Sequence, residues 1–328
     1  MRVRRKRRIL RSIRKSSELN VVQNHTGRIR PDDILLVSTM RNEQIRLPFF
    51  LQYYRDLGVD HFLFVDNDST DGTQEYLAGQ PDVSLWHTRA SYKSSTFGVD
   101  WMNWLQRKYC HNHWTLVVDP DEFFVFPFCD TRSIRALTDW LDNSAIRSFA
   151  AMLLDVYPKG PIDAVPYQAG QDPLEIASWF DSGNYVITRN PTYSNLWIQG
   201  GPRSRVFFAN QPKQAPALNK TPLVKWDRKY AYVSSTHTLL PRGLNQVYDD
   251  WGGEKASGIL LHTKFLDTFT AKAHEELSRG QHYAESAEYK AYASQVHVQP
   301  ELWCKWSEKY INWRQLEILG LMSKGNWA

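Results

Sequence analysis

The sequence has few cysteines and no long hydrophobic run. Its 328 residues include three cysteines, Cys110, Cys129 and Cys304, whose wide spacing matches neither a disulfide framework nor a metal motif. No segment approaches the roughly 18 uninterrupted apolar residues of a transmembrane helix. No apolar segment of the signal-peptide kind follows the basic start of the chain either. We therefore expect a cytoplasmic protein with free thiols.

Positive charge is concentrated at the start of the chain. The net charge is +5, but residues 1–15 contain nine Lys or Arg and no acid, which leaves 31 basic and 35 acidic residues in the remainder. We expect residues 1–31 to be a basic, polar arm. It could be disordered and solvated, contact an anionic membrane, or bind nucleic acid. Nucleic acid is not expected, because no zinc spacing or RNA-binding motif accompanies the arm. Ile9, Leu10 and Ile13 form a thin apolar stripe that does not support a strong membrane anchor.

Strands and helices alternate through the first half of the chain. The patterns predict strands near 34–40, 61–67, 83–88 and 114–119 and helices near 47–57, 71–78 and 98–110. Such alternation is typical of an α/β fold with a mainly parallel sheet flanked by helices. A helix near 131–142 and a strand near 149–156 follow. Residues 157–235 are predicted to form loops and small strands, and residues 266–320 to be helical, ending in a helix at 301–321.

An acidic turn after a buried strand is the most informative motif. The mainly apolar segment 114–118 leads into Asp119-Pro120-Asp121-Glu122, after which apolar residues resume. Buried carboxylates cost several kcal/mol each unless a cation answers them, and carboxylate oxygens favour Mg²⁺ or Mn²⁺. The alternative is a strand that ends in a solvated acidic turn, broken by Pro120.

Two upstream loops strengthen the metal interpretation. The mainly apolar segment 34–40 ends at Arg41-Asn42-Glu43, and the mainly apolar segment 61–65 ends in a polar loop that begins at Asp66. Open α/β sheets bind ligands at the carboxyl ends of their strands. These loops and the acidic turn are therefore expected to share one site.

Four ordered motifs resemble the family 2-type glycosyltransferases with the GT-A fold, and within them a bacterial group related to family 92. The motifs are residues 41–43 (Arg-Asn-Glu), 57–61 (Leu-Gly-Val-Asp-His), 66–73 (Asp-Asn-Asp-Ser-Thr-Asp-Gly-Thr) and 119–123 (Asp-Pro-Asp-Glu-Phe). The resemblance covers roughly residues 33–130. The later segment 260–265 (Leu-Leu-His-Thr-Lys-Phe) is similar to the downstream His motif of this group.

The resemblance implies a role for several residues. Asp119 and Asp121 match the Asp-x-Asp motif, whose metal ion bridges the two phosphates of a nucleotide sugar, and His262 matches the histidine that completes this site. The residues that match the nucleotide-binding loops are Asn42, Glu43, Asp66 and Asp68. Basic residues near the phosphates could add charge stabilisation, and the candidates are Arg41, Lys93, Arg203 and Lys264.

The sequence signals for the histidine ligand and for the catalytic base are less specific. An isolated His262 is more often a core residue than a ligand, but it follows an apolar strand, and imidazole with carboxylates suits Mn²⁺. His237 is the competing candidate. An inverting transfer also needs an Asp or Glu to take the proton of the acceptor hydroxyl. The candidates are Asp155, Asp181, Asp249 and Asp250, of which we favour Asp250 because it lies shortly before His262.

The resemblance implies an enzyme that transfers a sugar from a nucleotide-diphosphate sugar to a glycan or lipid-linked acceptor, with Mn²⁺ or Mg²⁺ as cofactor. We expect an arm at 1–31, a GT-A domain at 32–265 and a helical extension at 266–328. The nucleotide-sugar half of that domain would be 32–130 and its acceptor half 131–265. Together with the basic arm, the resemblance suggests that the enzyme acts at the inner face of the membrane. A metal-dependent phosphoesterase and a non-catalytic carbohydrate-binding protein are the alternatives.

Overall fold

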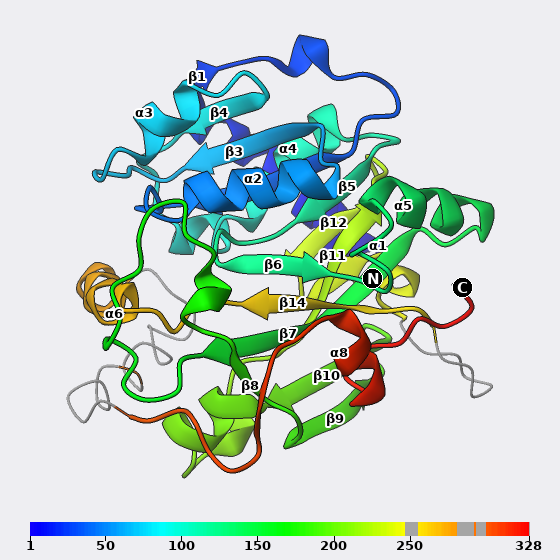
Figure 1. The fold of residues 1–328 in the computed structure, drawn as a ribbon. Helices are drawn as coiled ribbons and strands as arrows, with labels where there is room; N and C mark the ends of the chain where they lie inside the picture. Colours follow the sequence, from blue (N-terminus) through cyan, green and yellow to red (C-terminus); the bar gives the residue numbers. More distant parts are fainter. Residues whose placement is uncertain (247–254, 281–291, 293–299, 328) are drawn as a thin grey trace.

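A mixed sheet of eleven strands runs through the centre of the molecule (Figure 1). The computed structural model describes residues 1–246, 255–280, 292 and 300–327. Nine strands form a continuous path in the order β1-β4-β3-β2-β5-β11-β7-β14-β6, while β8 pairs with β7 and β15 with β8. Their bounds are β1 Asn20–Gln23, β2 Leu35–Met40, β3 His61–Asp66, β4 Val83–His87, β5 Trp114–Val117, β6 Glu122–Val125, β7 Ser148–Tyr157, β8 Trp179–Asp181, β11 Asn219–Lys225, β14 Gly258–His262 and β15 Ser307–Lys309.

Strands β4, β3, β2 and β5 form a parallel block, as the alternating pattern predicts. Met40 of β2 is in register with Asp66 of β3, and Asp66 with His87 of β4. The carboxyl ends of these strands therefore lie at one edge of the sheet, and the polar loops that follow them meet there. The predicted α/β class with flanking helices is confirmed.

Helices cover both faces of the parallel block (Figure 1). Helix α2 (Leu47–Leu57) packs on the face that carries Leu36, Phe62 and Phe64, and α4 (Val99–Tyr109) packs on the face that carries Leu35, Val37 and Leu63. Successive side chains of a strand point to opposite faces, so each buried strand supplies both cores. Helices α3 (Thr73–Ala78) and α5 (Ile134–Asn143) match the predicted segments.

The second half of the sheet is mostly antiparallel. Strand β11 lies between β5 and β7 and is antiparallel to both, whereas β14 runs parallel to β7 and antiparallel to β6. The sequence predicted only loops and small strands over 157–235. The position of β11 inside the main sheet was therefore not predicted. Pro222 explains it, because this proline interrupts the strand pattern and lies at a shift in register between Lys220 and Leu223. Two hairpins pair β9 (Tyr185–Asn190) with β10 (Asn195–Gly200) and β12 (Ala231–Ser234) with β13 (Thr238–Leu240).

The basic start of the chain is folded onto the domain. Helix α1 (Arg2–Lys15) lies against α4, where Arg11 Nε pairs with Asp100 Oδ2 at 2.7 Å, and β1 adds an antiparallel strand beside β4. The interpretation of this segment as a disordered, solvated arm is wrong. Burial of Ser12 and of the Asp100 carboxylate against α1 gives the helix a fixed place.

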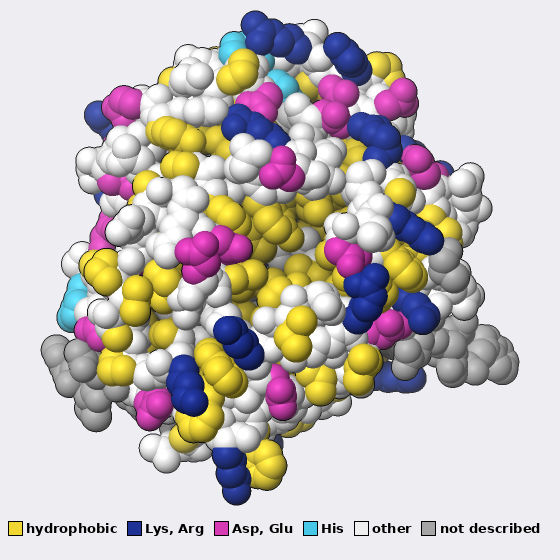
Figure 2. All heavy atoms as spheres, viewed as in Figure 1, with side chains coloured by type: hydrophobic (Ala, Val, Ile, Leu, Met, Phe, Trp, Pro, Cys, Tyr) yellow, Lys and Arg dark blue, Asp and Glu magenta, His cyan; other side chains and the backbone are white. Residues whose placement is uncertain are grey.

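The described part of the C-terminal region differs from the prediction. It contains α6 (Thr268–Arg279), β15 and the short α8 (Trp313–Ile318), which begins at the capping residue Asn312. The predicted helix 301–321 is wrong, because residues 307–309 pair with β8 instead. Among the described residues, none of the helices is both long and apolar enough to cross a bilayer. Figure 2 shows hydrophobic side chains gathered in a hollow between α2 and α8 on the face viewed.

Candidate active site

A narrow polar cleft lies at the edge where the parallel strands end. It has a volume of about 160 Å³ and is lined by the ends of β2, β3 and β14, by the acidic turn between β5 and β6, and by α6. Its acidic lining residues are Glu43, Asp119 and Asp121, and its basic ones are Arg41, Lys264, Lys272 and Arg279. The cleft therefore offers both carboxylates for a cation and a group of cations for an anionic ligand.

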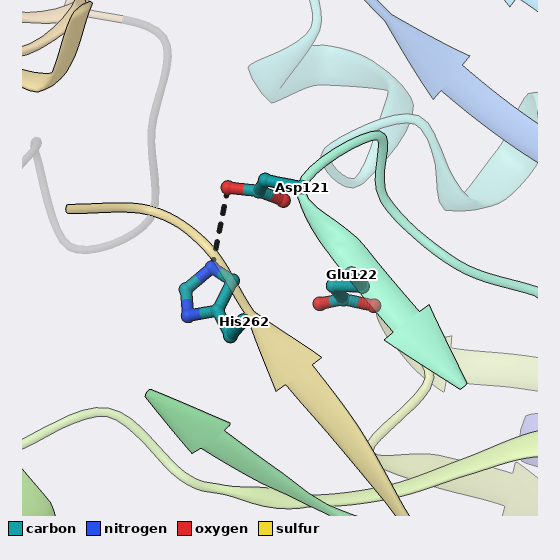
Figure 3. A group of neighbouring side chains, drawn as sticks. All are labelled: Asp121, Glu122 and His262. Atoms are coloured by element: carbon teal, nitrogen blue, oxygen red, sulfur yellow. Dashed lines mark ion pairs between the residues drawn. The ribbon is translucent and has the colours of Figure 1, made fainter. Parts of the chain in front are cut away.

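Asp121, Glu122 and His262 form a cluster that could hold a metal ion (Figure 3). One ligand atom from each lies within 4.8 Å of the others, and Asp121 Oδ2 is 3.2 Å from His262 Nε2. The antiparallel pairing of β6 with β14 places Glu122 opposite His262. Two carboxylates and one imidazole are a donor set that suits Mn²⁺, and carboxylates suit Mg²⁺. The residues present thus fit the predicted ion.

A second layer of buried residues fixes the ring of His262. Its Nδ1 lies 2.6 Å from Asp155 Oδ1, and the other oxygen of Asp155 accepts a hydrogen bond from Arg203 Nε at 2.8 Å. Parallel pairing of β14 with β7 brings His262 beside Asp155. When Nδ1 donates to Asp155, Nε2 is free to bind a metal, which is the usual carboxylate–histidine–metal arrangement. Both oxygens of the predicted base Asp155 are thus engaged inside the protein.

Lys220 is a functional candidate that the sequence analysis missed. Its buried ammonium group, on β11, lies 3.2 Å from Asp119 Oδ2 and also contacts the carboxylate of Glu122. A lysine within a buried strand was the available signal, because a lysine is almost never fully buried unless it is paired. Asp119 is half exposed and lies outside the three-residue metal cluster, whereas Glu122, which we did not assign, lies inside it.

Charge and burial together set the protonation of this group. Burial alone would raise the pKa of Asp121, but His262 and Arg46 hold it well below its ordinary value. Burial alone would lower the pKa of His262, but Asp121 and Asp155 outweigh it and raise this pKa. Burial raises the pKa of Glu122 to about 7, against the pull of Lys220. The cluster therefore favours a proton on His262 when no metal competes for it.

The 41–43 loop is held by helix α6. Arg41 Nε lies 3.1 Å from Glu275 Oε1, and Asn42 Nδ2 donates to the same oxygen at 2.7 Å. Glu43 forms ion pairs with Lys272 and, at 3.4 Å, with Arg46. Arg41 and Glu43 thus line the cleft, and Asn42 is joined to α6 beside them. The α6 partners were not predicted, because nothing in their sequence marks which loop they contact.

The loop after β3 places its two predicted aspartates in different surroundings. Asp66 is fully buried and accepts a hydrogen bond from the amide of Ser69 at 3.3 Å, and burial raises its pKa. Asp68 has a left-handed backbone (φ 61°) and lies between His87 Nε2, at 3.5 Å, and Arg89 Nε, at 3.3 Å. Between them, Asn67 lines the cleft, although the sequence analysis did not single it out.

The remaining predicted residues lie away from the cleft or outside the described residues. Lys93 lies beside the arginines of α1. Asp181 belongs to a separate buried group, in which Arg205 Nη2 contacts its Oδ1 at 2.9 Å. His237 is bound through Nδ1 to the carbonyl oxygen of Asn219 at 2.6 Å. Asp249 and Asp250 lie outside the residues that the structure describes.

Comparisons with known proteins give only distant likenesses. No protein-family model and no curated protein matches the chain. A structure described as a glucose-1-phosphate thymidylyltransferase from Bacillus anthracis, in complex with a sucrose, aligns with a TM-score of 0.29 and 9% identity over 88% of this chain and 95% of the other. A 4-diphosphocytidyl-2C-methyl-D-erythritol synthase aligns with a TM-score of 0.27 and 11% identity over 88% and 98%.

Proposed function

We propose that the protein is a glycosyltransferase that moves a sugar from a nucleotide-diphosphate sugar to a glycan or lipid-linked acceptor. One observation carries this proposal. Asp121 and His262 of the metal cluster share a single cleft with the 41–43 loop, at the carboxyl edge of a parallel block. Three further basic side chains line the same cleft: Lys264, Lys272 and Arg279. A nucleotide diphosphate needs both a cation between its phosphates and donors around them, and this cleft brings both together.

Asp121, Glu122 and His262 would hold Mn²⁺ or Mg²⁺, with Asp119 at the rim. When bound, such an ion acts as a Lewis acid that offsets the charge developing on the leaving diphosphate. Lys264, Lys272 and Arg279 line the same cleft and would contact the phosphate oxygens directly. The Asp155–Arg203 pair orients His262 so that Nε2 faces the carboxylates.

The proposed base stays Asp250. Asp155 is closed off by its two internal partners, and Asp181 belongs to a different group of residues. We expect Asp250→Asn to lower kcat at saturating donor while donor affinity stays near that of the wild type, because only the proton acceptor is removed. Asp249→Asn is the matched control. A near-normal kcat for Asp250→Asn, beside a large loss for Asp249→Asn, would move the role to Asp249.

A panel of nucleotide sugars tests the proposal, with saccharide acceptors and with or without Mn²⁺. We expect metal-dependent release of the nucleoside diphosphate together with a glycosylated product. Metal-dependent hydrolysis of a phosphate ester without sugar transfer would instead indicate a phosphoesterase. Binding of saccharides without turnover would indicate a carbohydrate-binding protein.

A ligand variant tests the site itself. Asp121→Asn replaces an anionic ligand by a neutral one, so we expect it to lower Mn²⁺ affinity and transfer by more than the roughly 10- to 100-fold typical of second-layer changes. Asp139→Asn, at an exposed position on α5, is the control and should match the wild type. Undiminished Mn²⁺-dependent transfer in Asp121→Asn would refute the metal assignment.

A further inference from the structure

Helix α1 has two chemically different faces. Its inner face docks on the domain, with Arg8 Nη1 donating to Thr96 Oγ1 at 3.0 Å, Arg11 paired with Asp100 and Ser12 buried. Its outer face carries Val3, Leu10 and Ile13, which are 64%, 66% and 39% exposed. The exposed basic side chains beside them include Lys6, Arg7 and Arg14.

The outward residues form one continuous surface. Positions 3, 6, 7, 10, 13 and 14 recur at intervals of three and four, which places them on one side of a helix. This set, which we call the outer face of α1, contains three apolar and three basic residues and no acid. The apolar stripe thus differs from the one in the sequence analysis, because Val3 belongs to it and the less exposed Ile9 does not.

Exposed apolar residues are concentrated in this part of the molecule. Of the twelve large apolar side chains exposed in the described residues, six lie within the first 22 residues, and four of these belong to residues 1–13. Single exposed apolar side chains are ordinary, but several on one face rimmed by polar residues mark an interaction surface. Apolar side chains flanked by Lys and Arg are the composition of helices that lie at a bilayer surface.

We propose that the outer face of α1 rests on an anionic lipid bilayer. Each basic residue near an acidic leaflet contributes about 1 kcal/mol, and Val3, Leu10 and Ile13 would leave water for the headgroup boundary. Nucleic acid would match the charges equally well, but it would gain nothing from the three apolar side chains. The helix is already formed and docked, so binding does not have to order it.

This surface also has a defined relation to the cleft. Arg8 and Arg11 contact the loop that carries Ser94 and Thr96, and Tyr92 in the same loop lines the cleft. A bilayer under α1 would therefore hold the cleft near the lipid surface, where a lipid-linked acceptor presents its sugar. This last step rests on the proposed function, whereas the lipid contact does not.

The test is sedimentation of the full chain with vesicles of phosphatidylcholine, alone or mixed with phosphatidylglycerol. We expect binding to the mixed vesicles at low salt that weakens as salt screens the charges. Lys6→Gln/Arg7→Gln/Arg14→Gln should weaken it on the order of 100-fold. Val3→Ser/Leu10→Ser/Ile13→Ser should weaken it at every salt concentration. The control Ile311→Ser/Ile318→Ser removes two apolar side chains that are 71% and 84% exposed elsewhere, and it should bind like the wild type.

Three outcomes would overturn the proposal. The first is equal binding of the wild type to neutral and anionic vesicles, and the second is unchanged binding in both triple variants. The third is tight binding to duplex DNA or RNA that the basic variant loses and the apolar variant keeps, which would make this face a nucleic-acid surface. Transfer to a soluble saccharide acceptor should be equal in all variants, so failure of the lipid contact and failure of the proposed enzyme activity are distinguishable.

Discussion

Two buried aspartate–arginine pairs lie on neighbouring strands of this protein and contact different parts of the molecule. Asp155 of β7 pairs with Arg203, and Asp181 of the neighbouring β8 pairs with Arg205. Both arginines belong to one π-helical turn, Arg203–Phe207. Asp155 continues to His262 and so to the cleft, whereas Asp181 accepts a hydrogen bond from the hydroxyl of Tyr157 inside the domain. The same ion pair thus supports a candidate site in one place and joins structural elements in the other.

Removing the arginine of each pair should have the largest effect on stability. Arg203→Met leaves the nearly inaccessible Asp155 carboxylate without its arginine partner, and losing one partner of a buried pair costs about 3 to 5 kcal/mol. Arg205→Met should cost less, because Arg205 is 24% exposed and water can replace part of its charge. Urea unfolding of both variants measures the difference. A larger loss for Arg205→Met would mean that burial does not rank the two pairs.

Substituting each aspartate in turn distinguishes support of the proposed metal site from a purely structural role. Asp155→Asn weakens the hydrogen bond that orients His262, so we expect Mn²⁺ affinity to fall by roughly 10- to 100-fold. Asp181→Asn should lower stability but leave Mn²⁺ affinity within about twofold of the wild type, since second-layer effects require contact with a ligand. Titration of Mn²⁺ followed by electron paramagnetic resonance gives both affinities. Equal losses would show that Asp155 has no special link to the metal.

The pKa values of the two buried histidines are shifted in opposite directions. His262 lies among carboxylates that raise its pKa, whereas burial and the nearby Lys220 lower the pKa of His237 from 6.5 to about 4. The unfolded chain therefore takes up a proton at His237 before the folded protein does as the pH falls. The contribution of His237 to stability is complete above about pH 6.5 and declines by up to about 1.4 kcal/mol per pH unit between pH 6.5 and 4.

His237→Gln removes this dependence. We expect the free energy of unfolding of the wild type to fall more steeply between pH 6.5 and 4 than that of the variant, as followed by urea titrations at each pH. The remaining ionisable groups are the same in both proteins, so the difference between the two curves isolates His237. Parallel curves would mean that His237 titrates alike in the folded and unfolded states.

The sequence predicted the parallel block better than the remainder, for physical reasons. Strands β2, β3 and β5 are short buried runs that end in polar loops, so local pattern sufficed to place the 41–43 loop and the acidic turn at one edge. The assignment of His262 to the same site rested on resemblance, and pairing of β14 with β6 places it there. Glu122 was not assigned, because which side chain of the turn faces His262 depends on that long-range register.

Other parts of the site had no local signal. Lys220 lies in a strand interrupted by Pro222, and its carboxylate partners are about a hundred residues earlier in the chain. Glu275 and Lys272 contact the 41–43 loop from a helix more than two hundred residues later. The basic arm was misjudged because charge density predicts solvation, whereas docking depends on Asp100 and Thr96 of another segment.

The pairing of β14 with β6 and β7 has a consequence for the kinetics of folding. His262 meets Asp155 across 107 residues, and Lys220 meets Glu122 across 98. Contacts of such sequence separation form slowly, because a long loop must close before they stabilise anything. Strands β6 and β14 and the turn before β6 carry the cluster, and β7 and β11 carry its partners Asp155 and Lys220. All four strands must be in register before the whole group is assembled. Uptake of Mn²⁺ during refolding should therefore follow the last pairings of the sheet and lag behind the appearance of helical structure.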